Sequence, residues 1–583
     1  MKRETCCVLR VACCVLRGAC LVAVLAAAAC APAKQPVPRI IAVDLASPQV
    51  ARYGKLELAV ALEATYDNPY DVRQVELAAV FTSPDGREWT APGFWDGQGA
   101  WRVRFTPSAQ GAWRYRLRVR DQQGESKPYD GQFNCTPSDR HGWLQVGAWV
   151  DPAYSARYLA HHDGAPFYGV GHCDAFDVMS YGWDEEQGFV LFDRMAEHGE
   201  NMLVYWPVYS NPFFATHYGH YSVPDLKVID LVVEDAARKG IYLVFTVWDH
   251  GLLRDETHAW GNGLWETHNG FRALGSLDSF FTDAEAWAWQ ENLYRYFIAR
   301  WGYSPAIGLW QTVSEIEGTN AGPHTDRWHE RVNRYFVEHD PYRHPTTASK
   351  AGDAWWPAGY AVMDVTQMHS YNSGNDAVGT GPLIADWTQK LWQAETNPNF
   401  IGEFGTSDER LHPALLHNGV WAGLAAGAAA TPMEWNDSGA WGKMDDGMLD
   451  QMSHLAAFVA DLPLAHLDPL PLEVTTGNEE LRAWGLMGGS QESKMGFLWV
   501  QDTAWQSGKA ASQQIGKSAN RQIREAATVV VAGLATGTYT VRPYDTWQGV
   551  YLDESQVTTD ESGQLVIVLP PFSGDIAVRL VNW

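Results

Sequence analysis

The sequence predicts a multidomain protein with an N-terminal β-sandwich, a central α/β TIM barrel of the (β/α)8 type and a C-terminal β-sandwich. Short segments with alternating apolar and polar residues dominate both ends of the chain, and this alternation is typical of strands with one buried face. Between residues 143 and 465, apolar runs alternate with helical segments, which is the pattern of a parallel sheet built from strand–helix units. The 583 residues suffice for several domains.

The composition narrows the classes of function that fit the chain. A net charge of −26 argues against nucleic acid as a general partner. The 28 Trp residues are an unusually large number; indole rings suit stacking on sugars, although most of these residues are expected to fill the cores of β-rich domains. Six of the eight Cys precede residue 31, so Cys135 and Cys173 form one bridge or remain free thiols, and a disulfide framework is excluded.

Residues 1–30 are expected to be a processing segment. Four basic residues precede an apolar run, Leu21–Ala29, that is too short to span a bilayer. The small residues before Cys30 resemble a bacterial lipoprotein signal, which implies a lipid anchor on Cys30, attachment to a membrane through that anchor, and a cell-surface or periplasmic location. Plain secretion is the alternative. Residues 31–38 contain three Pro and are expected to act as a tether.

An immunoglobulin-like β-sandwich is predicted for residues 39–138. Apolar and polar residues alternate in Trp101–Phe105 and again in Trp113–Arg120, as in half-buried strands. The polar positions of these two segments carry six Arg, which share one outward face if the strands pair. That face binds an anionic polysaccharide or the next domain, or it is a solvated surface paired with acidic neighbours.

The barrel is predicted for residues 143–465. Helical patterns such as Asp283–Arg300 and Asp326–Glu338 separate its strands, and eight strand–helix units over this length fit a (β/α)8 barrel. The eight expected strands are Phe167–Gly171, Met202–Trp206, Tyr242–Trp248, Ile307–Glu315, Thr346–Ser349, Val362–Tyr371, Asn399–Glu403 and Ala428–Trp435.

The C-terminal ends of these strands are rich in groups that do chemistry, and the active sites of such barrels lie at that end. His369 and Tyr371 have the same parity along their strand and so point inward together. Each group alone has an ordinary structural explanation, such as a buried histidine with a satisfied hydrogen bond. Together they indicate an active site containing His172, Asp174, Trp206, Trp248, Asp249, His250, Ser314, Glu315, His369, Tyr371, Glu403 and Trp435.

At these positions the chain resembles the large clan of retaining glycosidases built on (β/α)8 barrels. The segments Arg295–Pro305, Asp340–Pro345 and Tyr66–Tyr70 are similar to those of cellulase-like and apiosidase-like barrels that carry an N-terminal immunoglobulin-like domain of uncharacterised function. The resemblance implies that Glu315 is the catalytic acid/base and Glu403 the nucleophile.

The resemblance also implies which residues bind the substrate. His369 and Tyr371 support the nucleophile in this interpretation, and Trp435 forms a platform for a sugar ring. Ser314 departs from the clan, which usually has Asn there; because Ser offers one donor where Asn offers two, the usual contact with the sugar 2-hydroxyl is in doubt. The full set expected to bind substrate is His172, Trp206, Trp248, His250, Ser314, His369, Tyr371 and Trp435.

The implied activity is hydrolysis of O-glycosidic bonds in a plant or algal polysaccharide or its oligosaccharides by two carboxylates, with no cofactor. Metal catalysis has little support, because no His-Glu-x-x-His motif occurs; His161-His162-Asp163 precedes the first strand, and calcium at acidic loops such as Asp445-Asp446 stays open. The alternative function is a non-catalytic glycan-binding surface lipoprotein on the same barrel, although the presence of both Glu315 and Glu403 argues against it. A peptidase or collagen-binding protein has no catalytic motif in the sequence.

A second sandwich is predicted for residues 469–583, where short alternating strands return. The segment Tyr544–Gly549 resembles a motif in the C-terminal β-domains of related enzymes. Trp547 within this segment binds glycan or packs in a turn.

Overall fold

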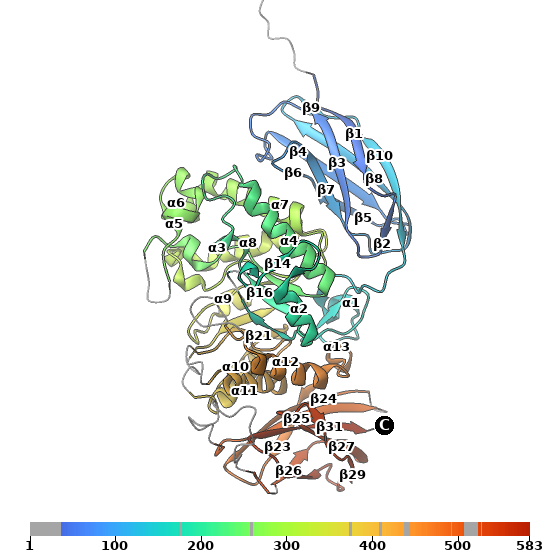
Figure 1. Ribbon diagram of the computed structural model, residues 1–583, viewed down its shortest axis with the longest axis vertical. Helices are drawn as coiled ribbons and strands as arrows, with labels where there is room; N and C mark the ends of the chain where they lie inside the picture. Colours follow the sequence, from blue (N-terminus) through green and yellow to red (C-terminus); the bar gives the residue numbers. More distant parts are fainter. Residues whose placement is uncertain are drawn as a thin grey trace, which may run out of the picture.

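Figure 1 shows the computed structural model of the chain, with sheets at the N-terminal end in blue, a central region of helices and strands, and sheets at the C-terminal end in red. The structure describes residues 36–174, 176, 178–256, 261–371, 376–406, 411–435, 444–490, 493–505, 523–525 and 527–582. The expected lipidation site, Cys30, lies outside these residues. Within them, no helix combines the length and apolar character needed to cross a membrane.

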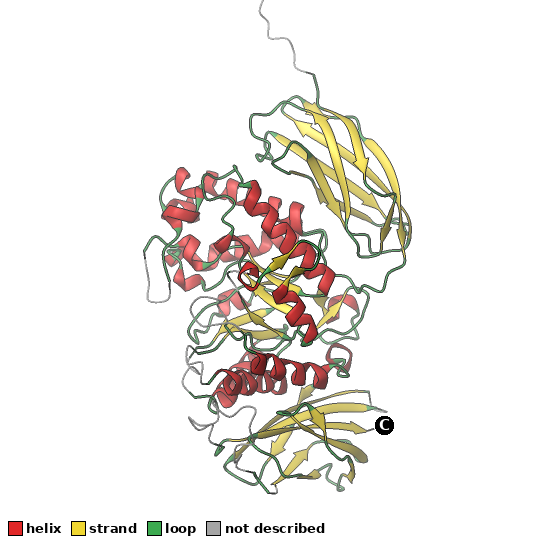
Figure 2. Cartoon of the chain, in the orientation of Figure 1, coloured by secondary structure: helices red, strands yellow, loops and turns green. Residues whose placement is uncertain are grey.

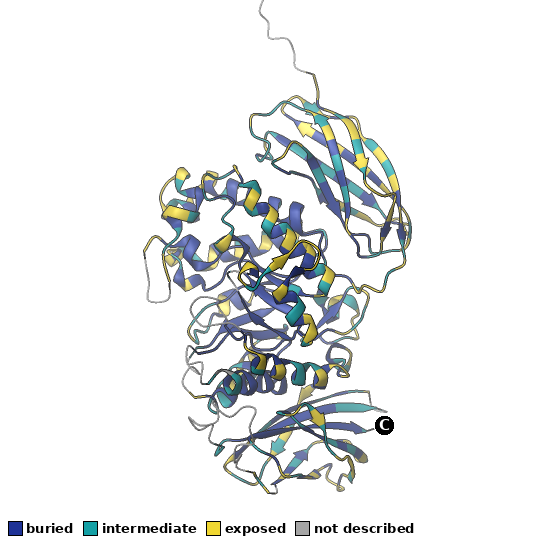
Figure 3. Cartoon of the chain, viewed as in Figure 1, coloured by how far each residue is buried: buried dark blue, intermediate teal, exposed yellow. Residues whose placement is uncertain are grey.

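Two sheets form the N-terminal region, with the orders β1-β3-β7-β6 and β2-β10-β8-β4-β5, and β9 pairs with β8. In β8, every second side chain is buried, as the alternation in the sequence predicts (Figure 3). The buried residues include Leu58, Phe81, Val103 and Trp113 in one apolar core. The strands are β1 (Arg39–Leu45), β2 (Gln49–Ala51), β3 (Leu56–Glu63), β4 (Val75–Thr82), β5 (Glu88–Pro92), β6 (Phe94–Trp95), β7 (Trp101–Phe105), β8 (Gly111–Asp121), β9 (Gly124–Glu125) and β10 (Tyr129–Thr136).

The central region contains parallel strands in the order of the chain. One sheet has the order β13-β16-β17-β18-β19, and β20 pairs with β21. Six of these strands lie inside the predicted segments, whereas β13 begins where its predicted segment ends. The parallel strands are β13 (Gly171–Cys173), β16 (Met202–Tyr205), β17 (Tyr242–Thr246), β18 (Ile307–Gln311), β19 (Thr346–Thr347), β20 (Thr366–His369) and β21 (Asn399–Glu403).

Backbone hydrogen bonds close these strands into a ring. The eighth predicted segment, residues 428–435, lies between β21 and β13 and bonds to both. The links that complete the ring are Val365 N to Thr346 O at 3.0 Å, Met433 N to Ile401 O at 2.9 Å and Cys173 N to Glu434 O at 2.9 Å. Because all the strands run the same way, their C-terminal ends meet at one edge of the ring.

Helices surround the strands of the ring (Figure 2). Their ends follow local signals: the Asp283 side chain accepts hydrogen bonds from the first backbone N–H groups of α7, and α4 ends at Gly240, which has a left-handed φ of 74°. The helices of at least eight residues are α2 (Val190–Glu197), α4 (Val223–Lys239), α7 (Ala284–Trp301), α8 (Thr325–His339), α10 (Thr380–Ala394), α11 (His412–Ala426) and α12 (Asp446–Val459).

The arginines of the N-terminal region do not form one surface. The condition for a shared face, pairing of β7 with β8, is not met, because the two strands belong to different sheets. On β7, Arg104 is buried; it pairs with Asp230 of α4 at 3.1 Å and donates to the carbonyl oxygen of Arg300 of α7 at 2.9 Å. On β8, three arginines pair with acidic neighbours: Arg116 with Asp130 at 2.7 Å, Arg118 with Glu125 at 2.6 Å and Arg120 with Glu76 at 2.7 Å. Arg104 thus docks the central region, while the β8 arginines form a solvated face.

The C-terminal region also consists of two sheets. The larger has the order β22-β24-β25-β31-β27-β28, with β29 beside β27, and the smaller has the order β23-β26-β30. The strands are β22 (Leu470–Pro471), β23 (Glu473–Thr475), β24 (Leu481–Gly489), β25 (Lys494–Asp502), β26 (Ala527–Ala532), β27 (Thr538–Asp545), β28 (Val550–Tyr551), β29 (Ser555–Thr558), β30 (Leu565–Leu569) and β31 (Asp575–Asn582). Helices α10, α11 and α12 lie between these sheets and the ring (Figure 1).

A buried carboxylate, Asp575, joins the C-terminal sheets to α11. Burial favours the neutral form of Asp575, but the charge and hydrogen bond of His417 outweigh burial and lower the pKa of Asp575. Trp547 stacks on the His417 ring at a centroid distance of 3.8 Å, so it packs at this junction. The contacts of the Asp575 carboxylate are His417 Nε2 at 2.9 Å, Trp499 Nε1 at 2.8 Å, Thr546 Oγ1 at 2.6 Å and Trp547 Nε1 at 2.7 Å.

We expect Asp575→Ala to destabilise the protein by about 3–5 kcal/mol, because it removes one partner of a buried charged pair and leaves the other donors unsatisfied. Urea unfolding of the full chain measures this loss. Asp553→Ala, at an exposed position of the same region, is the matched control and should leave the free energy of unfolding unchanged. Equal stabilities of the two variants would contradict a structural role for the Asp575 network.

Candidate active site

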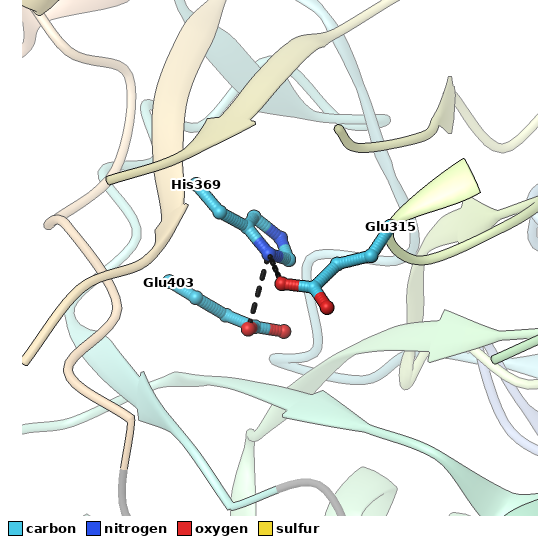
Figure 4. Close-up of side chains that lie close together, drawn as sticks. All are labelled: Glu315, His369 and Glu403. Atoms are coloured by element: carbon cyan, nitrogen blue, oxygen red, sulfur yellow. Dashed lines mark hydrogen bonds and ion pairs between the residues drawn. The ribbon is translucent and has the colours of Figure 1, made fainter. Parts of the chain in front are cut away.

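Glu315 and Glu403 lie at the C-terminal edge of the ring with His369 between them (Figure 4). Glu403 is the last residue of β21, His369 is the last residue of β20, and Glu315 follows β18. The Nδ1 atom of His369 is 2.9 Å from Oε1 of Glu315 and 3.0 Å from Oε2 of Glu403. All three side chains are buried. The structure therefore brings both predicted catalytic carboxylates into contact with one imidazole, that of His369.

An irregularity in strand pairing aligns His369 with Glu403. Met368 pairs with Ile401, but the following pair is His369 with Glu403, because the register shifts at this point. In a regular ladder His369 would stand opposite Gly402. Since side chains alternate along a strand, the shift places the imidazole and the carboxylate on the same face. An extra residue of this kind commonly re-aims a side chain near a functional site.

The position of His369 between two carboxylates sets its charge. Burial alone lowers the pKa of an imidazole, but the Coulombic attraction of Glu403 and the hydrogen bonds to Glu315 and Glu403 outweigh burial and raise the pKa of His369 to about 10. His369 is therefore an imidazolium at neutral pH. Its positive charge offsets the mutual repulsion of the two carboxylates, which stand close together in a buried site.

Glu403 receives a second hydrogen bond from the predicted residue Tyr371. The Tyr371 hydroxyl donates to Oε2 of Glu403 at 2.5 Å. Burial and the charges of Glu403 and Glu315 raise the pKa of Tyr371 well above its usual value, so the phenol keeps the proton that it donates. The other carboxylate oxygen, Oε1, is 4.0 Å from Sγ of Cys173. Cys173 and Cys135 are both free thiols.

The backbone at Glu315 is held in an unusual conformation. Glu315 has a φ of 54°, in the left-handed region that non-glycine residues rarely adopt and that often marks functional sites. Its N–H donates to Oγ of Ser349 at 3.0 Å, and Oγ of Ser314 lies 3.5 Å from the same hydroxyl. Ser314 is fully buried and supports the turn that presents Glu315.

A group of aromatic side chains lies near the two carboxylates. The centroids of Trp206 and Trp435 are 5.5 Å apart, and the Phe176 ring is 5.3 Å from each of them. We call Phe176, Trp206 and Trp435 the aromatic group. His250 stands perpendicular to Trp206 at 5.6 Å, and its Nδ1 is 3.3 Å from Oε2 of Glu315. The predicted residues Trp206, His250 and Trp435 thus lie around the carboxylates.

Two predicted substrate-binding residues lie elsewhere. His172 is fully buried and its Nδ1 contacts Glu200 at 2.8 Å; its neighbour Cys173 occupies the alternate position that faces Glu403. Trp248 is also fully buried, packs on Phe280 at 5.2 Å and donates through Nε1 to the Tyr294 hydroxyl at 3.0 Å. Neither side chain has a surface for a sugar, so both assignments are corrected to structural roles.

Sequence reasoning missed three residues that contact this site, Cys173, Phe176 and Ser349. The first strand was predicted to end at Gly171, whereas β13 runs to Cys173, so His172 lies within the strand and the alternation turns Cys173, its neighbour, toward Glu403. Ser349 was the last residue of a predicted strand, so its position was an available signal. Phe176 follows the strand in a loop, where no periodicity indicates direction.

A further carboxyl group, Asp249, lies beside His250. It is buried and accepts a hydrogen bond from the backbone N–H of Leu252 at 3.1 Å. Burial raises the pKa of Asp249 to about 7, with backbone hydrogen bonds only partly opposing this effect. The folded state therefore disfavours the ionised form of this side chain.

Comparison with known families matches only part of the chain. Residues 49–120 match the model of a domain of unknown function, DUF5060. No curated protein matches the sequence.

One solved structure shares the fold, and two further glycoside hydrolases give weaker matches. A protein from Bacteroides vulgatus described as a "putative glycoside hydrolase" has a TM-score of 0.65 and 15% identity, and the match covers 91% of this chain and 99% of that chain. An endo-1,4-beta-mannanase from Rhizomucor miehei has a TM-score of 0.42 and 16% identity, covering 54% of this chain and 99% of that one. A family 39 glycoside hydrolase from Bacteroides cellulosilyticus has a TM-score of 0.42 and 11% identity, covering 92% and 99%. The structural neighbours are thus glycoside hydrolases, and the likeness concerns the fold.

We expect Asp249→Asn to raise the free energy of unfolding, relative to the wild type, at pH 8 but not at pH 4. The folded-state pKa of about 7 exceeds that of an unfolded Asp, about 3.9, so ionisation costs the wild type stability as the pH rises between these values. Asn cannot ionise. The gain should be on the order of 1–4 kcal/mol, since one pKa unit corresponds to about 1.4 kcal/mol.

Urea unfolding of wild type and variant at both pH values measures this effect. Asp255→Asn, at an exposed nearby position, is the control and should show no such trend. A stability difference for Asp249→Asn that is the same at pH 4 and pH 8 would refute the raised pKa.

Proposed function

We propose that this protein is a retaining glycoside hydrolase that cleaves O-glycosidic bonds of a plant or algal polysaccharide, or of its oligosaccharides, by double displacement. In this proposal the closed ring of parallel segments is a (β/α)8 barrel of the retaining glycosidase clan, flanked by an immunoglobulin-like sandwich and a C-terminal β-domain. Glu403 is the nucleophile and Glu315 the acid/base.

The observation that carries the proposal is the spacing of the two carboxylates. One oxygen of Glu315, one oxygen of Glu403 and a ring nitrogen of His369 all lie within 4.8 Å of one another. Retaining enzymes hold their carboxyl groups about 5–5.5 Å apart, whereas inverting enzymes hold them about 6.5–9.5 Å apart to admit a water. The short spacing supports direct attack by one carboxylate.

In the first step, Glu403 attacks the anomeric carbon while Glu315, in its protonated form, gives its proton to the departing glycosidic oxygen. Oε2 of Glu403 accepts from Tyr371 and contacts His369, which leaves Oε1 as the attacking oxygen. The glycosidic bond breaks, and a covalent glycosyl–Glu403 ester forms. The leaving group departs as an alcohol.

In the second step, the now ionised Glu315 takes a proton from water, and the resulting hydroxide oxygen attacks the same carbon. The ester bond to Glu403 breaks and the free sugar leaves with its original anomeric configuration. Glu315 ends protonated and Glu403 ionised, so the site returns to its starting state. The positive charge of His369 stabilises Glu403 as a leaving carboxylate.

The aromatic group supports a carbohydrate as substrate. Apolar faces of sugar rings stack on indole and phenyl rings, and Trp206 of the aromatic group lies against His250, which contacts Glu315. Pockets of this kind combine apolar walls with a few placed polar groups. His250, beside Glu315, and Tyr371, on Glu403, supply such polar groups.

We expect Glu315→Gln to lower kcat by roughly 10²–10⁴-fold on glycosides with sugar leaving groups, because general acid catalysis is lost. The loss should be much smaller on aryl glycosides, whose leaving groups depart without protonation. Glu403→Gln should abolish turnover on both substrates. A panel of polysaccharides, oligosaccharides and aryl glycosides, followed by reducing-end and release assays, measures these rates.

Glu338→Gln on the exposed face of α8 is the matched control and should keep the wild-type rate. Proton NMR of the first product should show retained anomeric configuration. Full activity in either catalytic variant would refute the assigned roles, and an inverted product would refute double displacement. Binding of a glycan without hydrolysis by the wild type would favour the non-catalytic alternative.

We also propose that the protein is exported and anchored through lipid on Cys30. Cys30→Ser should then abolish incorporation of a labelled fatty acid in a bacterial host and move the protein from the membrane fraction to the soluble fraction, because a single thiol carries the anchor. Cys20→Ser, in the same segment, is the control and should leave labelling intact. Persistent labelling of Cys30→Ser would exclude this anchor.

A further inference from the structure

Arg254 is a buried basic residue beside the active site that the proposed displacement steps do not use. It follows the short 3-10 helix η2 (His250–Leu253) in the loop after β17, and its side chain is fully buried. Nη1 of Arg254 donates to the carbonyl oxygen of Gly318 at 3.3 Å, and Nη2 donates to that of Asn262 at 3.1 Å. Since Gly318 lies three residues after Glu315, Arg254 binds the turn that carries the proposed acid/base.

This turn needs support from outside. It is the 3-10 helix η4 (Ile316–Gly318), and it begins directly after Glu315, whose φ of 54° is left-handed. A non-glycine residue in that region is strained and persists where the surrounding structure fixes it. Inside the turn, the N–H of Gly318 donates to the carbonyl oxygen of Glu315 at 2.8 Å. Contacts from the neighbouring loops therefore help to fix the direction of the Glu315 side chain.

The loop after β19 holds the turn from one side. Because the sheet has the order β17-β18-β19, Glu315, which follows β18, lies between the loops that follow β17 and β19. The N–H of Ile316 donates to the carbonyl oxygen of Ser349 at 3.1 Å, and Oε1 of Glu317 accepts from the N–H of Ala351 at 2.5 Å. These bonds fix the first two residues of the turn.

The loop after β17 holds the turn from the other side. The N–H of Asn320, just beyond the turn, donates to the carbonyl oxygen of Leu253 at 2.9 Å, and Arg254 donates to Gly318, the last residue of the turn. The second carbonyl that Arg254 contacts, that of Asn262, lies farther along the same connection. The guanidinium is therefore held between two backbone oxygens, and its planar fork of donors suits such a double contact.

The charge of Arg254 reinforces these contacts. Burial lowers the pKa of Arg254, and the negative charges of Asp249 and Glu315 oppose this effect; an arginine in a protein stays a cation all the same. The same loop also presents His250, whose Nδ1 is 3.3 Å from Oε2 of Glu315. When the proposed first step leaves Glu315 ionised, a cation that is fixed on its own turn attracts the carboxylate.

We propose that Arg254 is a positioning residue for Glu315. Its guanidinium fixes the turn behind the acid/base, so that Glu315 reaches the glycosidic oxygen in the first step and the attacking water in the second. This inference rests on the proposed function, and Arg254 acts on the substrate through Glu315 alone. A displacement of about 1 Å at a catalytic group can lower the rate roughly 10²-fold, so loss of this support should be visible in the kinetics.

The test compares leaving groups that need a proton with leaving groups that do not. We expect Arg254→Ala to lower kcat/KM roughly 10²-fold on glycosides with sugar leaving groups. The loss should be much smaller on aryl glycosides, because their leaving groups depart without protonation by Glu315. Arg327→Ala, which removes the same charge from an exposed position of α8, is the matched control and should keep the wild-type rates on both substrates. Thermal unfolding confirms that each variant is folded.

Two added reagents separate positioning from a general structural role. Azide attacks the anomeric carbon of the glycosyl–Glu403 ester without a base, and Glu403 leaves as a carboxylate. Azide should therefore accelerate turnover of aryl glycosides by Arg254→Ala, with a glycosyl azide as product, and leave the wild-type rate unchanged. Guanidinium chloride should partly restore the rate of Arg254→Ala on sugar leaving groups, because the ion replaces the lost group, whereas uncharged urea at the same concentration should not.

Equal losses on the two kinds of glycoside in a folded variant, no response to azide, or equal effects of guanidinium and urea would overturn the positioning role. If Arg254→Ala does not fold, Arg254→Lys gives the same comparison, because it keeps the charge and loses the planar fork of donors. A wild type that hydrolyses neither kind of glycoside would refute the proposed function and this inference with it. The other results, obtained with an active wild type, concern Arg254 alone.

Discussion

The functional site depends on one interaction, the bridge that His369 makes between Glu315 and Glu403. Two carboxylates buried a few ångströms apart repel each other strongly in a low dielectric. An imidazolium with contacts of 2.9 and 3.0 Å to the two of them offsets that repulsion, and a proton on Glu315, as the proposed first step requires, removes it. The same contacts raise the pKa of His369 to about 10, so the bridge is charged throughout the neutral range.

The backbone holds this bridge in place through local irregularities. The register shift between β20 and β21 turns His369 and Glu403 toward the same side. The left-handed φ of Glu315 turns the Glu315 side chain toward these two residues. Each irregularity carries a cost that surrounding contacts offset. For Glu315 these contacts include the hydrogen bond of its N–H to Ser349.

The sequence predicted those residues of the site that stand at the ends of predicted strands. Glu403, His369 and Tyr371 follow apolar runs directly, and parity along the strand determines that they point inward. His172 and Trp248 failed because their strands end two residues away from the predicted ends, so neither residue stands at the strand end that the prediction gave it. Whether β7 pairs with β8 stayed open in the sequence, because strand pairing depends on contacts between distant residues, which periodicity does not encode. The register shift at His369 was equally invisible in the sequence.

Both outer regions join the centre through charged and apolar contacts. The N-terminal sheets dock through buried Arg104, paired to Asp230, and through Phe94 of β6, which belongs to the main apolar core. The C-terminal sheet shares that core, since Phe497 and Trp499 of β25 belong to the same cluster as the helices of the ring, and it adds the pair of Asp575 with His417. It packs on α11, which is the helix that follows the strand of Glu403. Removal of the C-terminal sheet would expose that apolar face to water, at about 25 cal/mol per Å². The C-terminal sheet therefore stabilises the side of the ring that carries Glu403.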